Sequence, residues 1–208
     1  MNNYCYLTGA RVVLENETLN EAAVLIADGI IIAIDPENSC GAKEINLSGH
    51  ILMPGMIDLH CDALEKEAEP RPGVHFPFDF ACAQADKRNA AAGITTAFHA
   101  LSFANAELGV RNNHTAAELV RAVHAWQEHA LIDNKVHARY EITDQTAPAF
   151  LHELLAQTKI HLMSFMDHTP GQGQFKDINA YSNYLARTYK SSASEIAALL
   201  NNKAEQGE

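Results

Sequence analysis

From residue 51 onward, the sequence alternates between short apolar segments typical of β-strands and amphipathic segments typical of α-helices. Such alternation is typical of parallel βαβ units. The predicted strands are Ile51–Asp62, Ile94–Ala100, Val136–Ile142 and Ile160–Asp167. The predicted helices are Phe80–Ala92, one that opens with a capping box at Thr115–Glu118, Pro148–Gln157, and one capped by Ser192–Glu195. We therefore expect an α/β fold with about four strand–helix units over residues 51–208.

The first fifty residues have a different pattern, with short β-forming runs and turn residues. Asp28-Gly29 separates Ala22–Ile26 from Ile30–Ile34, which predicts a hairpin with a primed turn. Gly9 is expected to break the first β-forming run. We therefore expect residues 1–50 to form part of a small β-sandwich and residues 51–208 to form a separate barrel-like unit. A free-standing β-domain is the alternative for the first part.

The first of these barrel-type strands ends in two potential metal ligands, His60 and Asp62. Residues two apart on a strand point to the same face, so both side chains are expected to project together at its carboxyl end. Leu52, Ile57 and Leu59 are expected to form its buried body, and Cys61 to point into packing. A His-x-Asp pair alone is weak evidence, because an ordinary hydrogen-bonded pair has the same pattern.

Two longer blocks carry a more specific signal. Leu52-Met-Pro-Gly-Met-Ile-Asp-Leu-His-Cys-Asp62, followed by Glu65-Lys66 and Pro70-Arg-Pro72, resembles the first-strand signature of the amidohydrolase superfamily, and specifically its phosphonate-metabolism member. Phe165-Met-Asp-His-Thr-Pro-Gly-Gln-Gly-Gln-Phe175 resembles the same family. The superfamily usually has His-x-His where this chain has His60-x-Asp62. The resemblance implies a (β/α)8 TIM-like barrel, whose chemistry lies at the carboxyl ends of its strands.

The implied reaction is hydrolysis of α-D-ribose 1-methylphosphonate 5-triphosphate to the 5-phosphate and diphosphate, in the carbon–phosphorus lyase pathway. The implied cofactor is a divalent metal, with zinc favoured over manganese and iron. His60, Asp62, Glu141 and His168 are the expected metal ligands, and Lys66 and Arg71 the expected substrate contacts. No catalytic base is assigned, because the resemblance places that residue beyond residue 208. Thr169 and the glycines Gly171 and Gly173 form a turn that is also suited to phosphate.

Composition limits the partners. A formal net charge of −11 argues against nucleic acid, whose binding requires clustered Lys and Arg. No apolar run approaches the roughly 18 residues of a membrane span, and no signal peptide is recognisable, so we expect no membrane association and a cytoplasmic location. A phosphorylated sugar phosphonate is the expected partner.

The number of predicted strands limits the activity. Four strand–helix units make about half of an eight-stranded barrel, so the chain resembles only the N-terminal part of such an enzyme, and we expect no enzyme-like rate from the chain alone. Exposed sheet edges are expected to favour self-association. Two alternatives remain: another amidohydrolase, such as a deacetylase or cyclic amidase, and a truncated, non-catalytic assembly domain.

Overall fold

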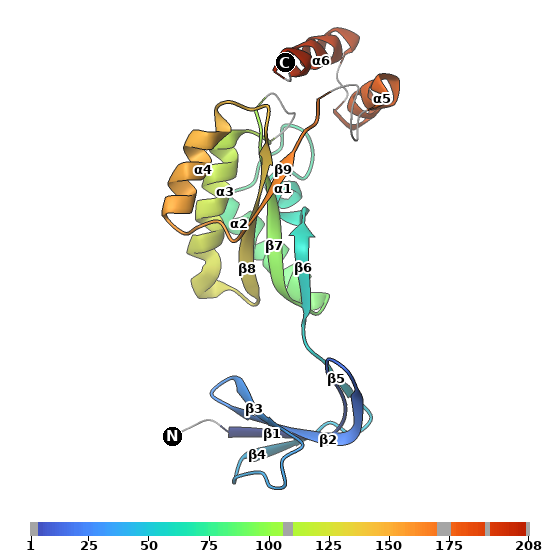
Figure 1. Cartoon of the computed structure of the whole chain (residues 1–208), viewed down its shortest axis with the longest axis vertical. Coiled ribbons are helices and arrows are strands. Elements are labelled where there is room, and N and C mark those ends of the chain that lie inside the picture. The colour runs from blue at the N-terminus through green and yellow to red at the C-terminus, as the bar shows by residue number, and fades with distance from the viewer. Residues whose placement is uncertain (1–3, 106–109, 170–175, 190–191, 207–208) are drawn as a thin grey trace. The chain divides into compact units, whose positions relative to one another are not determined.

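A computed structural model of the chain describes residues 4–105, 110–169, 176–189 and 192–206. Its contacts divide the chain into two compact units, Met1–Gly55 and Met56–Glu208. The division falls five residues after the boundary expected at residue 50. Each unit has its own sheet (Figure 1).

The first unit is a five-stranded mixed sheet in the order β3-β2-β1-β4, with β5 also paired to β1. Its strands are β1 (Tyr4–Val13), β2 (Thr18–Ala27), β3 (Ile30–Ile34), β4 (Lys43–Asn46) and β5 (Ile51–Leu52). The predicted hairpin between β2 and β3 is confirmed. Asp28 (φ 49°) and Gly29 (φ 80°) both have positive φ, as a type I′ turn requires.

Gly9 does not break β1 as expected, but lies at an irregularity within it. The pairing with β2 shifts register between Leu7 and Ala10, which is the signature of a bulge. Gly9 has φ 72°, and a Cβ atom there would meet the Ser48 Oγ at 2.5 Å. The glycine is therefore required both by backbone conformation and by space.

The second unit is built on a four-stranded parallel sheet in the order β6-β7-β8-β9. The predicted α/β fold, a partial TIM-like barrel with about four strands, is confirmed for the described residues. The strands are β6 (Met56–Cys61), β7 (Ile94–Phe103), β8 (Asp133–Glu141) and β9 (Leu162–Met166). The helices are α1 (Ala63–Ala68), α2 (Phe78–Ala91), α3 (Asn113–Trp126), η1 (Gln127–His129, a 3-10 helix), α4 (Ala147–Ala156), α5 (Ile178–Tyr189) and α6 (Ala193–Gln206).

Helices α2, α3 and α4 cover one face of this sheet (Figure 1). Their apolar side chains pack on Leu101 and Phe103 of β7 and on Val136 and Ala138 of β8. Because side chains alternate along a strand, His137, Arg139 and Glu141 lie on the opposite face of β8. We call this opposite face the inner face, because in a closed barrel it would line the interior.

The single strand predicted over Ile51–Asp62 is wrong. Residues 51–52 pair with β1 in the first sheet, and residues 56–61 pair with β7 in the second, with Pro54-Gly55 between them. Ile57 and Leu59 are not buried either, with exposed fractions of 63 % and 58 %, whereas Leu52 is partly buried but packs in the core of the first sheet. The physical reason is that β6 is an edge strand of the described sheet, so its side chains lack neighbours on one side.

Helix starts were predicted with mixed success. Helix α3 is capped by Asn112, whose side chain accepts a hydrogen bond from Thr115 N (2.8 Å), so the capping box predicted at Thr115 is wrong. Asn is as good an N-cap as Ser or Asp, which explains the earlier start. The capping box at the start of α6 is confirmed by reciprocal hydrogen bonds between Ser192 and Glu195. Helices α1 and α5 were not predicted. No helix in the described parts of the chain is long and apolar enough to cross a membrane.

Strands β6 and β9 form the two edges of the parallel sheet, and both carry exposed apolar side chains, including Phe165 at 71 % exposure. Unpaired backbone groups at such edges favour pairing with another chain. We propose that the isolated chain self-associates through these edges. Light scattering should show dimers or larger species whose proportion rises with protein concentration. A sharp monomer peak at all concentrations would contradict this.

Candidate functional site

Parallel pairing places the carboxyl ends of β6, β7, β8 and β9 at one edge of the second sheet. Three of the predicted ligands, His60, Glu141 and His168, lie at the ends of strands or directly after them, and Asp62 follows β6. This is the edge at which barrel enzymes of this kind build their sites. The structure therefore places the four predicted ligands at one end of the sheet.

A β-bulge in β6 sets the position of His60. Asp58 pairs with Ala97 and Cys61 with His99, so two residues of β6 lie opposite Phe98 alone. The Asp58 carboxylate accepts a hydrogen bond from His60 N (3.0 Å) and supports the bulge. Bulges of this kind redirect side chains next to active sites. Cys61 is buried against the core, as predicted.

The side chains of His60 and Asp62 lie beside each other, with His60 in the bulged part of β6 and Asp62 just after the strand. His60 Nε2 lies 3.4 Å from Asp62 Oδ1, and the two side chains are 51 % and 44 % exposed. Asp62 occupies the N-cap position of α1 but makes no side-chain capping bond. Its Oδ1 is buried and makes no hydrogen bond to any described residue, although it lies at ion-pair distance from His60 and 3.7 Å from Arg139 Nη1. The carboxylate therefore has capacity for a further cation.

His137 completes this part of the inner face, with its ring 5.2 Å from that of His60 in an edge-on arrangement. Its Nδ1 lies 3.1 Å from the Leu59 carbonyl, which can only accept, so Nδ1 carries the proton. Nε2 then accepts from the Ser164 hydroxyl at 2.8 Å. Burial, aided by the charges of His60 and Arg139, lowers the pKa of His137, although the Leu59 hydrogen bond opposes the shift. His137 is therefore neutral near pH 7.

Glu141 and His168 form a second pair. His168 Nδ1 lies 2.7 Å from Glu141 Oε2, and His168 N donates to Glu141 Oε1 at 3.1 Å. Both side chains are largely buried. The pair links the carboxyl end of β8 to the segment that follows β9. These two residues were predicted as ligands one by one, and the structure brings them into direct contact.

The two pairs do not form one cluster. Within the described ranges, no group of three or more His, Cys, Asp or Glu side chains is placed to hold a metal ion. The donor types fit a divalent metal, because an imidazole and a carboxylate with spare capacity suit zinc, manganese and iron. The described residues thus bring together two potential donors, His60 and Asp62, while Glu141 and His168 form a separate pair.

The predicted substrate contacts lie on the surface. Lys66 is exposed in the last turn of α1, and Arg71 is exposed in the following loop, where Val74 N donates to its carbonyl (3.0 Å). Neither side chain contacts His60 or Asp62 in the described part of the chain. Glu65, next to Lys66, is buried and accepts from Ser102 N and Arg111 Nε, which fixes α1 against the end of β7.

Other polar residues of the second unit, such as His99 and Asp167, have structural roles. His99 lies on the helix-facing side of β7, where Nε2 donates to Asn134 Oδ1 (2.8 Å). Asn134 in turn donates to the buried Asp86. Asp167 accepts hydrogen bonds from Thr169. Gly171 and Gly173 lie outside the described residues.

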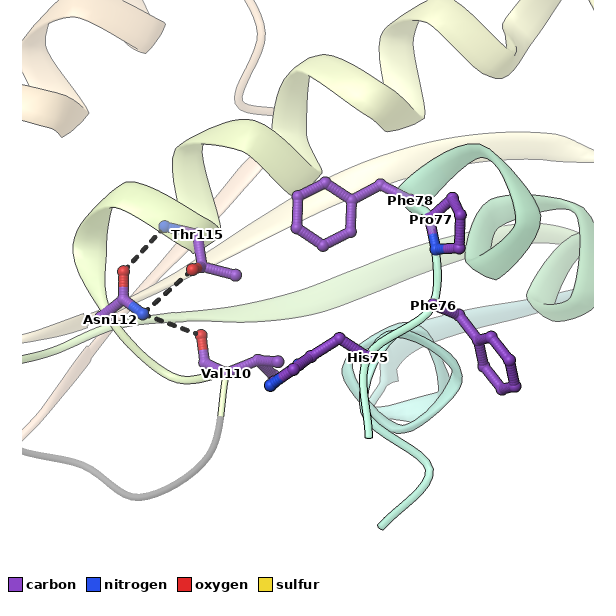
Figure 2. A pocket seen from close by; sticks show the side chains of 7 residues that line it. All are labelled: His75, Phe76, Pro77, Phe78, Val110, Asn112 and Thr115. Carbon is purple, nitrogen blue, oxygen red and sulfur yellow. Dashed lines mark hydrogen bonds between the residues drawn. The ribbon is translucent and has the colours of Figure 1, made fainter. Parts of the chain in front are cut away.

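A pocket of about 490 Å³ lies beside the start of α3 (Figure 2). It is formed by the segment that leads into α2 and by the first residues of α3. Its lining contains none of the six residues predicted as metal ligands or substrate contacts. The residues that line it are His75, Phe76, Pro77, Phe78, Val110, Asn112 and Thr115.

Comparison with known proteins adds an independent line of evidence. No protein-family model matches the chain. The chain is 29 % identical over 185 residues to the alpha-D-ribose 1-methylphosphonate 5-triphosphate diphosphatase of Escherichia coli (strain K12), a match that covers 88 % of this chain and 49 % of that protein. The resemblance predicted from the sequence is confirmed. The chain spans about half the length of the curated relative it matches.

Solved structures support the same fold at low sequence identity. The N-acetylglucosamine-6-phosphate deacetylase of Pasteurella multocida is similar with a TM-score of 0.56 at 13 % identity, over 96 % of this chain and 54 % of that one. The corresponding Mycobacterium smegmatis enzyme has a TM-score of 0.53 at 15 % identity, over 89 % and 48 %. The beta-aspartyl dipeptidase of Fervidobacterium islandicum has a TM-score of 0.51 at 12 % identity, over 89 % and 47 %. These are all amidohydrolase-type hydrolases, which confirms the fold.

Sequence reasoning missed His137, Arg139 and Ser164 on the inner face. The signal was available in the third predicted strand, where His137, Arg139 and Glu141 recur at a spacing of two. Three polar residues on one face of an otherwise apolar strand indicate a polar interior. Ser164 carries no such signal and is identified only by its contact with His137.

The buried His99 gives a pH-dependent prediction. Burial lowers the pKa of His99 below its ordinary value of 6.5, although the Asn134 hydrogen bond and nearby Asp86 oppose the shift. The unfolded chain therefore takes up this proton first as the pH falls, so stability is present above pH 6.5 and is lost below it. Urea unfolding at pH 7.5 and 5.5 should show a loss of up to about 1.4 kcal/mol per pH unit from this residue. His99→Gln should reduce the dependence, whereas the exposed His152→Gln should not. Equal slopes in wild type and His99→Gln would exclude His99 as the source.

Proposed function

We propose that the chain provides part of a metal-dependent hydrolase site that converts α-D-ribose 1-methylphosphonate 5-triphosphate and water to the 5-phosphate and diphosphate. The observation that carries this proposal is the His60–Asp62 pair at the carboxyl edge of a parallel sheet, with a buried Asp62 oxygen that makes no hydrogen bond to a described residue. The similarity to the E. coli diphosphatase supports the choice of substrate.

The proposed metal ligands are His60 and Asp62, with Glu141 and His168 contributing from β8 and from the segment after β9. Zinc is the preferred ion, and manganese and iron suit the same donors. A bound divalent metal would supply Lewis-acid stabilisation of phosphoryl oxygens and a water of lowered pKa. In the described structure these four side chains form two separate pairs, so Glu141 and His168 would move toward His60 and Asp62 when the metal binds.

The chain's own residues have distinct proposed roles. The bulge at Leu59-His60 aims the His60 imidazole at the site, and His137, neutral and hydrogen-bonded to the Leu59 carbonyl, supports the bulge from β8. Lys66 and Arg71 are proposed to contact the outer phosphates, since the loop that carries them follows the first-strand ligands directly. Lysine offers the phosphate oxygens a compact positive charge, and arginine offers them a planar guanidinium with paired N–H donors.

Metal content tests the ligand assignment. Wild-type protein equilibrated with zinc and then mildly dialysed should retain metal, and the double variant His60→Ala plus Asp62→Ala should lose most of it. Two exposed helix residues, His152 and Asp79, provide a matched control as His152→Ala plus Asp79→Ala. Elemental analysis gives the result directly. Equal metal content in all three proteins would remove His60 and Asp62 from the site and favour a non-catalytic assembly domain.

Diphosphate release tests the reaction. The chain alone is expected to release diphosphate roughly 10²–10⁴-fold more slowly than the E. coli relative, because no general base is assigned among its described residues. Addition of the separately produced C-terminal half of the E. coli relative should raise the rate in the presence of zinc or manganese. With His60→Ala plus Asp62→Ala in the chain, diphosphate release should not rise above background. This should hold both for the chain alone and for the chain mixed with the C-terminal half of the relative. Activity that survives this double change would contradict the proposal.

A further inference from the structure

Arg139 differs from the other paired arginines of this unit. Its side chain is 15 % exposed on the inner face of β8, and its only ion-pair contact among the described residues is Asp62, at 3.7 Å. That distance is too long for a hydrogen bond. By contrast, Arg88, Arg111 and Arg121 each reach a carboxylate oxygen at 2.5 to 2.8 Å.

The Arg139 side chain is largely covered, but none of its nitrogens is among the fully buried atoms that lack a partner in the described structure, so its unused donors are open to a ligand. Arginine has five N–H donors in a planar fork, and within the described residues the Arg139 side chain makes no hydrogen bond to the protein. An arginine that only stabilised the fold would be expected to bind a carboxylate or carbonyl closely, as Arg111 binds Glu65. The open fork instead indicates a ligand that is absent from the protein itself.

The surroundings define the chemistry of that ligand. The fork matches two oxygens of a phosphoryl group, which it binds by paired, charge-assisted hydrogen bonds. Arg139 lies beside Asp62, on the same face of the sheet as the His60–Asp62 pair. Lys66 and Arg71 are exposed on α1 and its following loop, whereas Arg139 projects from the sheet itself. Strand residues are held more firmly than loop residues, so Arg139 is suited to fix a ligand's position.

We propose that Arg139 is a substrate-binding residue that holds phosphoryl oxygens beside the His60–Asp62 pair. The inference rests on the proposed function, and it deepens it by naming the residue that receives the phosphate chain. The Asp62 carboxylate balances the guanidinium charge in the ligand-free protein. Lys66 and Arg71 then serve the outer part of the same chain of phosphates.

Calorimetric titration with diphosphate tests this, in the presence of a chelator so that metal makes no contribution. Arg139→Met removes the charge at similar length and should weaken diphosphate binding about 10- to 100-fold, as expected for lost charge-assisted hydrogen bonds. Arg139→Lys keeps the charge but not the planar guanidinium. Its affinity for diphosphate should therefore lie between those of the wild type and Arg139→Met. Lys135→Met is the matched control, because it removes a positive charge from the opposite end of the same strand, where Lys135 pairs with Asp133. It should bind as wild type does.

A second measurement needs no substitution. Phenylglyoxal labelling of the wild-type chain, read residue by residue by mass spectrometry, should show that diphosphate protects Arg139 but leaves Arg121 on the helix surface unprotected. Equal binding by wild type and Arg139→Met, no measurable binding by wild type, or no protection of Arg139 would each overturn the inference. The proposed function is tested by different measurements, the metal content and the rate of diphosphate release. Its failure can therefore be distinguished from failure of the Arg139 inference.

Discussion

Parallel pairing of β6, β7, β8 and β9 is the constraint on which the rest of the second unit depends. It sends all four carboxyl ends to one edge of the sheet, and it requires the helical connections that bury the other face. The helices α2, α3 and α4 occupy that face, and alternation along β8 places His137 and Arg139 on the inner face. The same pairing leaves β6 and β9 as edges, which explains why Ile57 and Phe165 are exposed.

One extra residue in β6 determines where the His60 side chain lies relative to Asp62 and His137. In a regular strand, His60 would pair with His99; the bulge instead gives that place to Cys61, which packs into the core. His60 is thereby redirected toward Asp62 and His137, and Asp62 is withheld from capping α1. A histidine, a carboxylate and a poorly satisfied guanidinium thus meet at the end of the sheet. This combination of donors for a cation and a fork for an anion is what a metal-assisted reaction on a phosphate requires.

Much of this arrangement could be predicted from residue patterns, and the failures have physical causes. Strand–helix alternation predicts the parallel sheet, and Asp28-Gly29 predicts the hairpin, because both signals are local. Burial of Ile57 and Leu59 was predicted from their apolar character, but burial depends on neighbours that the described sheet does not provide. The bulge was also missed, because pairing register is a property of two strands and not of one. His137 and Arg139 could have been found by the spacing that they share with Glu141.

We propose that the fold brings His60 and Asp62 together to hold a metal. Crystals of the chain grown with zinc, with diffraction recorded on both sides of the zinc absorption edge, test this most directly. We expect an anomalous peak within coordination distance of His60 Nε2 and Asp62 Oδ1, at about 2.0–2.2 Å from each. Zinc bound elsewhere in the chain, with no peak between these two atoms, would contradict it.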